Sequence, residues 1–402
     1  MKRFLAIALT LAMAFAMVAC GNTTNDTANS NGNTTGNNSS NTGDTSSDGG
    51  RTVYKLGAPT MLTGSAAMKG ISGMQAAQIA VDEINEAGGI NGIPVELVIE
   101  DTASDTSQAI EVARKFIADE EIVGIIGCDN TADSVASMPI YEEAQMPFIS
   151  IMASSNTFAP SSDYAWTVSG MVKNEVECTA AMIAEHLQAK SVVMVYVNND
   201  WGTSFLDNFE ECCAEYNIEI LGIESYVDGE TDFSSLMAKC RQYDPDVLFL
   251  GSQYAEAASI CNTIADMGWD VEIAGTGAIV DNNFLELAGE NAEGVYAYSA
   301  TVWTDEYPEA VAFAEKYTGE YGENPNVFCC AYEAVYAMCD ALATLPEEFT
   351  RDELNTAIGN LTTLKGLNGD MTWDEVGNTV KNYGYMKVVD GEWVTDGYYV
   401  AN

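Results

Sequence analysis

Basic residues and histidine are scarce in this chain of 402 residues. Lys and Arg number 16 against 60 Asp and Glu, the formal net charge is −44, and His186 is the one histidine. A protein of this charge repels phosphate backbones and anionic lipid, which argues against nucleic acid or acidic membrane surfaces as partners. Acidity of this size is more typical of a protein that stays soluble outside the cell.

Motifs of catalysis and metal binding are also lacking. The sequence contains no G-x-S-x-G elbow, no phosphate-binding P-loop, no C-x-x-C pair and no Cys/His cluster with zinc spacing. His186 lies in a helical stretch, where a histidine more often faces solvent than takes part in catalysis. The sequence therefore predicts neither an enzyme nor a cofactor or metal site.

Long apolar runs are confined to the start of the chain, where Phe4–Val18 follows the basic pair Lys2 and Arg3. This run is shorter than the ~20 residues that a membrane-spanning helix needs, and its basic front is typical of a cleaved export signal. The segment Met17–Gly21 resembles a bacterial lipobox, which predicts a signal peptide over residues 1–20 and lipidation at Cys20. The alternative is an ordinary signal peptide that happens to contain a cysteine.

Residues 21–50 are nearly all Asn, Thr, Ser and Gly. Such a stretch has almost nothing to bury and cannot offset the entropy cost of ordering its backbone, which predicts a disordered tether. As flexible coil it would have a root-mean-square reach of ~30 Å. We therefore expect a soluble protein held on the outer face of a bacterial cell membrane by lipid alone.

Cysteines would normally pair in an exported protein, but nine remain besides Cys20, so internal pairing must leave at least one free thiol. Most lie in apolar helical patterns beside Ala, Met and Tyr, where Cys behaves as a small hydrophobic residue. The sequence therefore predicts mostly reduced core cysteines rather than a disulfide framework. The nine are Cys128, Cys178, Cys212, Cys213, Cys240, Cys261, Cys329, Cys330 and Cys339.

After the tether, strands and helices alternate in two series. The first series is predicted as strand 53–58, helix 66–87, strand 95–100, helix 106–118, strand 122–126, helix 131–144 and strand 147–151. The second is predicted as helix 174–188, strand 192–197, helix 201–216, strand 218–226, helix 233–242, strand 247–250, helix 255–267, strand 271–274, helix 283–288 and strand 295–299.

Helices near 308–321 and 327–343 follow, and the tail alternates apolar and polar residues around Gly391, as an antiparallel hairpin does. Strands that alternate with helices of this length indicate parallel sheets covered on both faces. About 350 residues exceed what one hydrophobic core usually holds. The sequence therefore predicts an α/β fold with two doubly wound parallel-sheet lobes. Ligands of such folds bind outside the carboxyl ends of the strands.

Several ordered segments of residues 51–402 resemble one family, the substrate-binding lipoproteins of branched-chain amino acid ABC transporters. These segments are Thr63-Gly64, Ala80–Gly92, Ile125–Gly127, Pro147–Ser150, Asn199–Gly202 and Leu287–Gly289. The resemblance implies the type I periplasmic-binding-protein fold of the leucine/isoleucine/valine-binding proteins, with a multi-strand hinge. It further implies a monomer that captures a small amino acid, or a related carboxylate or amide, and delivers it to permease and ATPase subunits. The alternative is a binding protein that presents its ligand to a separate sensory receptor.

The family fold implies lobes built from non-contiguous segments, with three crossings between them. Lobe 1 is then expected over residues 51–171 and 300–375, and lobe 2 over residues 172–299 and 376–402. Ligand binds between the lobes, which close over it by hinge bending.

Thr131 is the strongest ligand-binding candidate. It follows a buried strand and begins a predicted helix, so its hydroxyl lies with free backbone N–H groups at the positive end of a helix dipole, which suits a carboxylate. The alternative is a plain N-cap threonine. The resemblance implies that Thr131 binds the ligand's α-carboxylate, that Ser154 adds a hydroxyl, and that Met152 offers a backbone carbonyl to its ammonium group. Neighbouring Asn130 is a further ligand-binding candidate. Ser154 could equally be an ordinary loop serine.

On the other lobe, Trp201 stands where relatives often carry a tyrosine, and an aromatic ring there can cover the ligand and face a cation. Tyr254 follows its strand in the same way. Met68 and Phe328 align near side-chain pocket positions. For Trp201, Met68 and Phe328 the alternative is ordinary core packing.

Gly277 stands where amino-acid binders of this family commonly place an acid that pairs with the ammonium group. A buried ammonium without a partner is costly. Either another acid replaces it, with Asp129 and Asp281 as candidates, or the ligand lacks an ammonium group.

Overall fold

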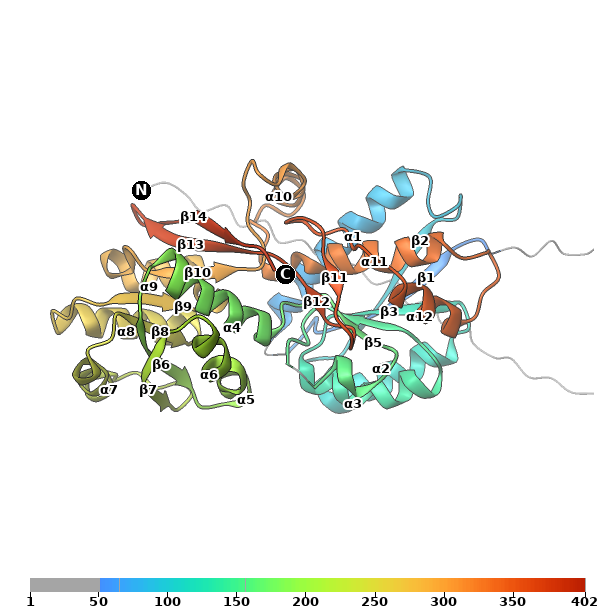
Figure 1. Cartoon of the computed structure of the whole chain (residues 1–402). Helices are drawn as coiled ribbons and strands as arrows, with labels where there is room; N and C mark the ends of the chain where they lie inside the picture. The colour runs from blue at the N-terminus through green and yellow to red at the C-terminus, as the bar shows by residue number, and fades with distance from the viewer. Residues whose placement is uncertain (1–50, 65, 156, 402) are drawn as a thin grey trace, which may run out of the picture. The chain divides into compact units, whose positions relative to one another are not determined.

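The computed structural model describes residues 51–64, 66–155 and 157–401. The predicted signal peptide, the tether and the lipidation site Cys20 lie outside these residues. The first lobe contains a five-stranded sheet in the order β2-β1-β3-β4-β5, and every pair in it is parallel (Figure 1). Its strands are β1 (Tyr54–Thr60), β2 (Val95–Asp101), β3 (Ile122–Gly127), β4 (Phe148–Ser150) and β5 (Ala165–Thr167).

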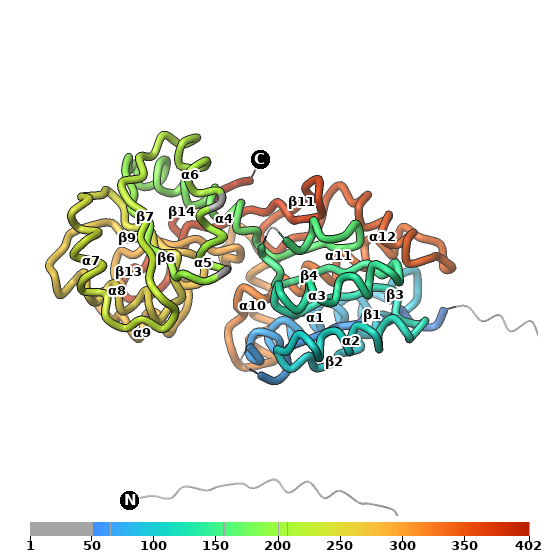
Figure 2. The backbone as a smooth tube through the Cα atoms, turned by 90° about the horizontal axis from the view of Figure 1, so that it is seen from below, coloured from blue at the N-terminus to red at the C-terminus, as the bar shows by residue number. Residues whose placement is uncertain are grey.

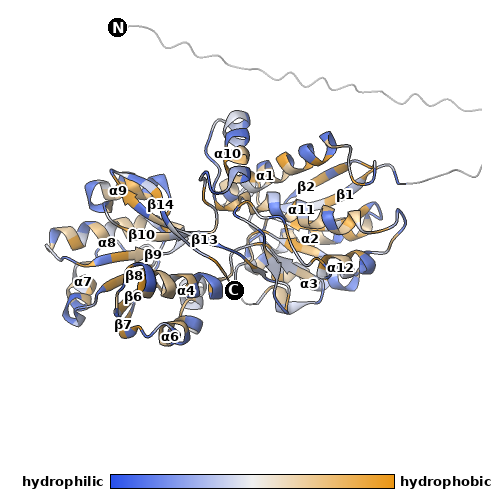
Figure 3. Ribbon diagram, turned by 45° about the horizontal axis from the view of Figure 1, so that its top comes forward, coloured by the Kyte–Doolittle hydropathy of each residue, from blue (hydrophilic) through white to orange (hydrophobic). Residues whose placement is uncertain are grey.

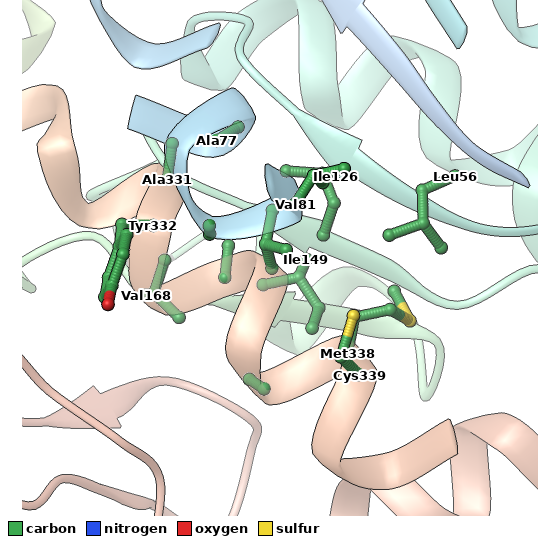
Figure 4. Packing of buried hydrophobic residues seen from close by; sticks show 14 of the residues in the cluster. Leu56, Ala77, Val81, Ile126, Ile149, Val168, Ala331, Tyr332, Met338 and Cys339 are labelled. Carbon is green, nitrogen blue, oxygen red and sulfur yellow. The ribbon is translucent and has the colours of Figure 1, made fainter. Parts of the chain in front are cut away.

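Helices cover both faces of this sheet, as its apolar strands require. Figure 2 shows α2 and α3 side by side, and α1 packs against α11. In Figure 4, Ile126 and Ile149 of the strands lie beside Val81 of α1 and Met338 of α11, all within one buried cluster. The helices of this lobe are α1 (Ala67–Glu86), α2 (Thr106–Ala118), α3 (Thr131–Glu143), α10 (Pro308–Tyr321), α11 (Cys330–Ala343) and α12 (Arg351–Gly359).

The second lobe contains a seven-stranded sheet in the order β14-β13-β10-β9-β8-β6-β7. Five strands are parallel, and the C-terminal hairpin β13-β14 adds to β10 in antiparallel orientation. The sequence pattern around Gly391 predicts this hairpin, but the sheet it joins is mixed rather than wholly parallel. Its strands are β6 (Ser191–Val197), β7 (Glu219–Tyr226), β8 (Val247–Gly251), β9 (Glu272–Gly275), β10 (Tyr296–Ser299), β13 (Tyr383–Val389) and β14 (Glu392–Tyr399).

The helices of the second lobe bury one face each against this sheet, and Figure 3 shows hydrophobic and hydrophilic residues mixed along them. They are α4 (Val172–Ala181), which continues into a π-helical turn (Met182–His186), α5 (Asp200–Ser204), α6 (Leu206–Glu215), α7 (Ser234–Cys240), α8 (Tyr254–Asp266) and α9 (Asn282–Ala288). A two-stranded ribbon, β11 (Thr372–Trp373) with β12 (Thr379–Val380), completes the described strands.

The structure differs from the sequence prediction at several elements. The predicted helix 201–216 is two helices that meet at Phe205. The predicted helix 327–343 opens with a 3-10 turn, Val327–Cys329. Strand β5, helix α12 and the ribbon β11-β12 are not in the prediction, because the strands are only two or three residues long and show no periodicity.

The chain passes between the two sheets three times, after β5, after β10 and before β13. Hydrogen bonds join these crossing segments to their neighbours. Val302 donates its backbone N–H to Asn368 Oδ1 (3.0 Å), and Asn368 Nδ2 donates back to the Val302 carbonyl (2.7 Å). The Asn174 amide donates to the Thr379 carbonyl (3.2 Å). These crossing segments form the multi-strand hinge that this fold class has.

Candidate functional site

A cleft of about 1560 Å³ is lined by residues from both lobes and from the crossing segments. In the first lobe several lining residues follow the carboxyl ends of β3 and β4, and in the second lobe several follow the ends of β6, β8 and β9. This edge of a parallel sheet is where ligands of doubly wound folds bind. The cleft is therefore the candidate binding site.

The structure brings eight of the ten predicted ligand-binding residues into the lining of this cleft. They are Asn130, Thr131, Met152, Ser154, Trp201, Tyr254, Gly277 and Phe328. Met68 and Asp129 are not among the lining residues. Met68 is 66% exposed on the first turn of α1, while its neighbour Lys69 does line the cleft and lies 5.6 Å from the ring centre of Phe328.

The N-terminus of α3 opens into the cleft. Asn130 is the N-cap residue: its Oδ1 accepts the backbone N–H of Asp133 (3.0 Å). Thr131 is thus the first helical residue and not the cap, so the alternative of a plain N-cap threonine is wrong. Because the first N–H groups of a helix have no acceptor within the helix, those of Thr131 and Ala132 are available beside the Thr131 hydroxyl. Together they form a site for an anion.

Asp129, just before this helix, is turned away from the cleft lining. Its side chain is buried, and the Thr102 hydroxyl donates to its Oδ1 (2.5 Å). Burial raises the pKa of Asp129 from 3.8 to about 7, the hydrogen bond from Thr102 opposes this, and the nearby carboxylates of Asp133 and Asp101 raise it further. The structure therefore does not place Asp129 where it could pair with a ligand in the cleft.

The turn after β4 is held by Ser150. Its Oγ accepts the backbone N–H groups of Met152 (3.3 Å) and Ala153 (3.0 Å). This fixes the turn that carries Ser154, whose carbonyl in turn accepts the N–H of Val172 at the start of α4 (3.3 Å). The half-buried Ser154 hydroxyl has no hydrogen-bond partner among the described residues. It is free to bind a ligand.

Aromatic residues and a glycine form the wall on the second lobe. Trp201 packs edge-on against Phe205, with ring centres 5.2 Å apart. Tyr254 begins α8 and is 36% exposed. A Cβ at Gly277 would lie 3.1 Å from the Tyr298 carbonyl oxygen, so a side chain there would be crowded. Trp201, Tyr254 and Gly277 therefore supply aromatic surface and no charge.

A polar cluster at the crossing segments, in which Glu333 and Lys381 are buried and Glu175 is partly buried, also reaches the cleft, and the sequence analysis missed it. We call it the hinge cluster: Glu175, Tyr298, Glu333 and Lys381. Lys381 Nζ donates to Glu333 Oε2 (2.7 Å) and to the Val168 carbonyl (3.2 Å), and the Tyr298 hydroxyl donates to Glu175 Oε2 (2.9 Å). Glu175, Tyr298 and Lys381 line the cleft. These residues are far apart in sequence and belong to ordinary helix and strand patterns, so no local signal joins them.

Burial sets the electrostatics of the hinge cluster. It raises the pKa of Glu175 from 4.5 to about 7, and the hydrogen bond from Tyr298 and the charge of Lys381 only partly offset it. Burial also disfavours the charge of Lys381, but the adjacent Glu333 carboxylate outweighs this and raises the pKa of Lys381. Lys381 and Glu333 therefore form a buried ion pair with Glu175 beside it.

All nine cysteines of the described chain are buried and unpaired by disulfides. Cys330 lines the cleft, and its thiol donates to the Ile151 carbonyl (3.3 Å). Burial raises the pKa of Cys330 to about 12, which keeps the thiol protonated. Such thiols are weak nucleophiles and weak metal ligands.

Over residues 51–64, 66–155 and 157–401, His, Cys, Asp and Glu form no group of three or more arranged to hold a metal ion. Within the same ranges no helix has the length and apolar character needed to cross a membrane.

Sequence comparison finds relatives over most of the chain. The "Leu/Ile/Val-binding protein homolog 1" of Brucella abortus (strain 2308) is 27% identical over 342 residues, which cover 83% of this chain and 90% of the relative. The "Leucine-, isoleucine-, valine-, threonine-, and alanine-binding protein" of Pseudomonas aeruginosa is 22% identical and covers 83% of this chain and 88% of its own.

Solved structures share the fold. The branched-chain amino acid transporter substrate-binding protein of Streptococcus pneumoniae, in complex with isoleucine, is 28% identical with a TM-score of 0.74 and covers 87% of this chain and 99% of its own. A Rhodopseudomonas palustris BisB5 solute-binding protein in complex with 3,4-dihydroxybenzoic acid has a TM-score of 0.74 at 20% identity and covers 87% and 98%. Residues 53–392 match the family described as periplasmic binding protein. With two α/β lobes, a cleft at the carboxyl ends of their strands and a family match over most of its length, this chain belongs to the periplasmic binding protein family.

Proposed function

We propose that this protein is the extracytoplasmic solute-binding component of an ABC importer. It captures a small amino acid, or a related carboxylate or amide, in the cleft and delivers it to a permease. It performs no chemical conversion of the ligand. The observation that carries the proposal is the N-terminus of α3, which presents a hydroxyl and backbone N–H groups to the cleft.

The ligands of two structural neighbours support a ligand that carries a carboxylate. Isoleucine and 3,4-dihydroxybenzoic acid differ in almost everything except that each carries a carboxyl group. In this chain the ligand carboxylate is held by the hydroxyls of Thr131 and Ser154 and by the first N–H groups of α3. Asn130 supports it as the cap that orients the helix end. Met152 adds its backbone carbonyl.

The aromatic side chains of the second lobe cover the rest of the ligand. Trp201 and Tyr254 line the cleft opposite Phe328. Closure by bending of the crossing segments would bring these rings onto the ligand and exclude water, which strengthens each polar contact. We assign residues 51–171 and 300–375 to one moving body and residues 172–299 and 376–402 to the other.

The cellular placement that we propose rests on the sequence of the first 50 residues. Lipid on Cys20 anchors the protein, and residues 21–50 tether it. Membrane fractionation of wild type and Cys20→Ala tests the anchor, and equal release of both proteins into the medium would contradict it. Loss of uptake of the bound ligand in a deletion strain tests delivery to a permease and distinguishes import from presentation to a sensor.

Isothermal titration tests the binding site itself, after a thermal-shift screen of amino acids, amides and small carboxylates. Thr131→Ala and Thr131→Val remove the hydroxyl, and the valine variant keeps the branched shape. A hydrogen bond to a charged group contributes ~1.5–3 kcal/mol, so affinity should fall about ten- to a hundredfold in both. Thr356→Val, the same change on the exposed surface of α12, is the control. Unchanged affinity in both Thr131 variants would show that the ligand lies elsewhere.

A further inference from the structure

An amino acid has an ammonium group as well as a carboxylate, and the wall at Gly277 offers it no anion. Among the described residues, four acids line the cleft: Glu175, Asp281, Glu315 and Glu392. Glu315 and Glu392 are exposed, on α10 and at the start of β14. Asp281 caps α9, and its Oδ1 accepts both the backbone N–H and the amide of Asn283 (2.7 Å each). Glu175 alone is recessed at the crossing segments and is not used as a cap.

Glu175 also lies near the proposed carboxylate site. It occupies the first turn of α4, whose first residue, Val172, donates its N–H to the Ser154 carbonyl (3.3 Å). Three residues of helix advance ~4.5 Å along the axis, so Glu175 lies less than one turn beyond the residue that is hydrogen-bonded to Ser154. The backbone of Glu175 is therefore close to the turn that carries the serine hydroxyl.

One oxygen of Glu175 remains available. Oε2 accepts the Tyr298 hydroxyl, and Oε1 has no hydrogen-bond donor among the described residues. Oε1 lies 3.1 Å from the point where a Cβ of Gly170 would stand, and Gly170 lines the cleft. A side chain at position 170 would cover this oxygen, so glycine keeps it accessible. The buried Tyr383 hydroxyl, 2.9 Å from the same point, likewise has no partner in the described chain.

The charges around Glu175 leave it unmatched. Lys381, the nearby base, is bound to Glu333 at 2.7 Å and to a backbone carbonyl. The remaining titratable groups that face Glu175 from the packed elements are neutral acids: Cys178 of its own helix, Tyr298 of β10 and Tyr383 of β13. The hinge cluster thus holds two carboxylates and one ammonium. A buried carboxylate without a cation is costly, and an ammonium group from the ligand would remove that cost.

We infer that Glu175 is the residue that binds the ligand's ammonium group, while the N-terminus of α3 binds its carboxylate. This inference rests on the proposed function and makes it specific. The ligand is a zwitterion whose ammonium group binds to α4 and whose carboxylate binds to α3. Glu175 on α4 then takes the role of the acid that the family resemblance leads us to expect at position 277.

Titration calorimetry with matched ligands tests the assignment. The probes are L-leucine, L-isoleucine and L-valine, each paired with the same acid lacking its amino group: 4-methylpentanoate, 3-methylpentanoate and 3-methylbutanoate. In Glu175→Gln, which keeps the bond from Tyr298, amino-acid affinity should fall about ten- to a hundredfold while affinity for the deaminated acids stays level or rises. Glu315→Gln, the same change at an exposed acid of the cleft, should alter neither.

The outcomes separate this inference from the proposed function. If the wild type prefers the amino acids and Glu175→Gln keeps that preference, or Asp281→Asn abolishes it instead, the inference is overturned and the proposed function stands. If the wild type binds only the deaminated acids, the ligand is a carboxylate and the ammonium site is refuted. If no amino acid binds, in this titration or in the thermal-shift screen, the inference is overturned; if no carboxylate or amide binds either, the proposed function fails as well. A second readout needs no variant: wild-type affinity for the bound amino acid should rise between pH 5.5 and pH 8 as Glu175 ionises, and affinity for its deaminated partner should not.

Discussion

The acid at position 129 gives the most direct test of the electrostatics, because Asp129→Asn should stabilise the protein at alkaline pH. Burial, with the carboxylates of Asp133 and Asp101, raises the pKa of Asp129 from 3.8 to about 7 against the hydrogen bond from Thr102. The folded state therefore holds a proton that the unfolded state releases, so the free energy of unfolding falls as pH rises through this window. Asparagine keeps the shape and the oxygen that accepts from Thr102 and never ionises.

The magnitude follows from the two pKa values. A rise from 3.8 to about 7 corresponds to about 4 kcal/mol at about 1.4 kcal/mol per pH unit, of which about 2–3 kcal/mol develops between pH 5 and pH 8. Relaxation of the protein around the Asp129 charge reduces this free-energy difference, so about 2–3 kcal/mol is an upper value. The stability of Asp129→Asn relative to wild type should thus increase by up to that amount between the two pH values.

Urea unfolding of wild type and variant at pH 5 and pH 8 measures the difference. Asp305→Asn, at an exposed position in the loop after β10, controls for the loss of one charge from a chain of net charge −44. The pKa of Glu175 is raised to about 7 as well, so the stability of the Asp129→Asn variant should still depend on pH, though less than that of the wild type. A stability difference that is the same at both pH values would refute the reasoning, because it would mean that Asp129 is ionised at pH 5 in the folded state.

Two further tests probe the buried groups. Lys381→Met should destabilise the protein by about 3–5 kcal/mol, since it leaves the Glu333 carboxylate buried without its partner. In the same urea assay, the double variant with Glu333→Gln should recover part of this loss. If it recovers none, packing and not charge explains the loss. In the Cys20→Ala protein, the nine buried thiols should react slowly with a thiol reagent until urea unfolds the chain, because burial keeps them inaccessible and protonated. Rapid modification of the native protein would contradict the burial described here.

Local sequence signals predicted the elements whose ends carry a cap or a turn. The predicted helix 106–118 matches α2 at both ends, since Asp105 accepts the N–H of Gln108 (2.9 Å) and fixes the first turn. Helix α12 was missed although Thr350 and Glu353 form a capping box, because its pattern of apolar residues is short. Strand β5 has only three residues and is defined by pairing with β4, which no local pattern reveals.

Some residues of the candidate site could likewise be predicted from the sequence, and others could not. Residues directly after a strand, such as Thr131, Ser154 and Tyr254, could be predicted because parallel strands end at one edge of a sheet. Asp129 is adjacent in sequence to Asn130 and Thr131, but its carboxyl group turns to Thr102 instead of the cleft. Rotation about one residue decides which neighbour reaches the ligand, and the sequence does not contain that information.

The hinge cluster shows what only the fold can supply. Glu175 begins α4, Tyr298 belongs to β10, and Lys381 precedes β13; they meet because the chain crosses between the lobes at these three places. Tyr298 connects the cluster to the wall at Gly277, since its carbonyl crowds the Cβ position of Gly277 while its hydroxyl donates to Glu175. An acid at 277 would need that space, whereas an acid at 175 gains a hydrogen bond from the same tyrosine. Gly277 and Glu175 therefore share one neighbour, Tyr298, and the absence of an acid at position 277 is best considered together with the presence of one at position 175.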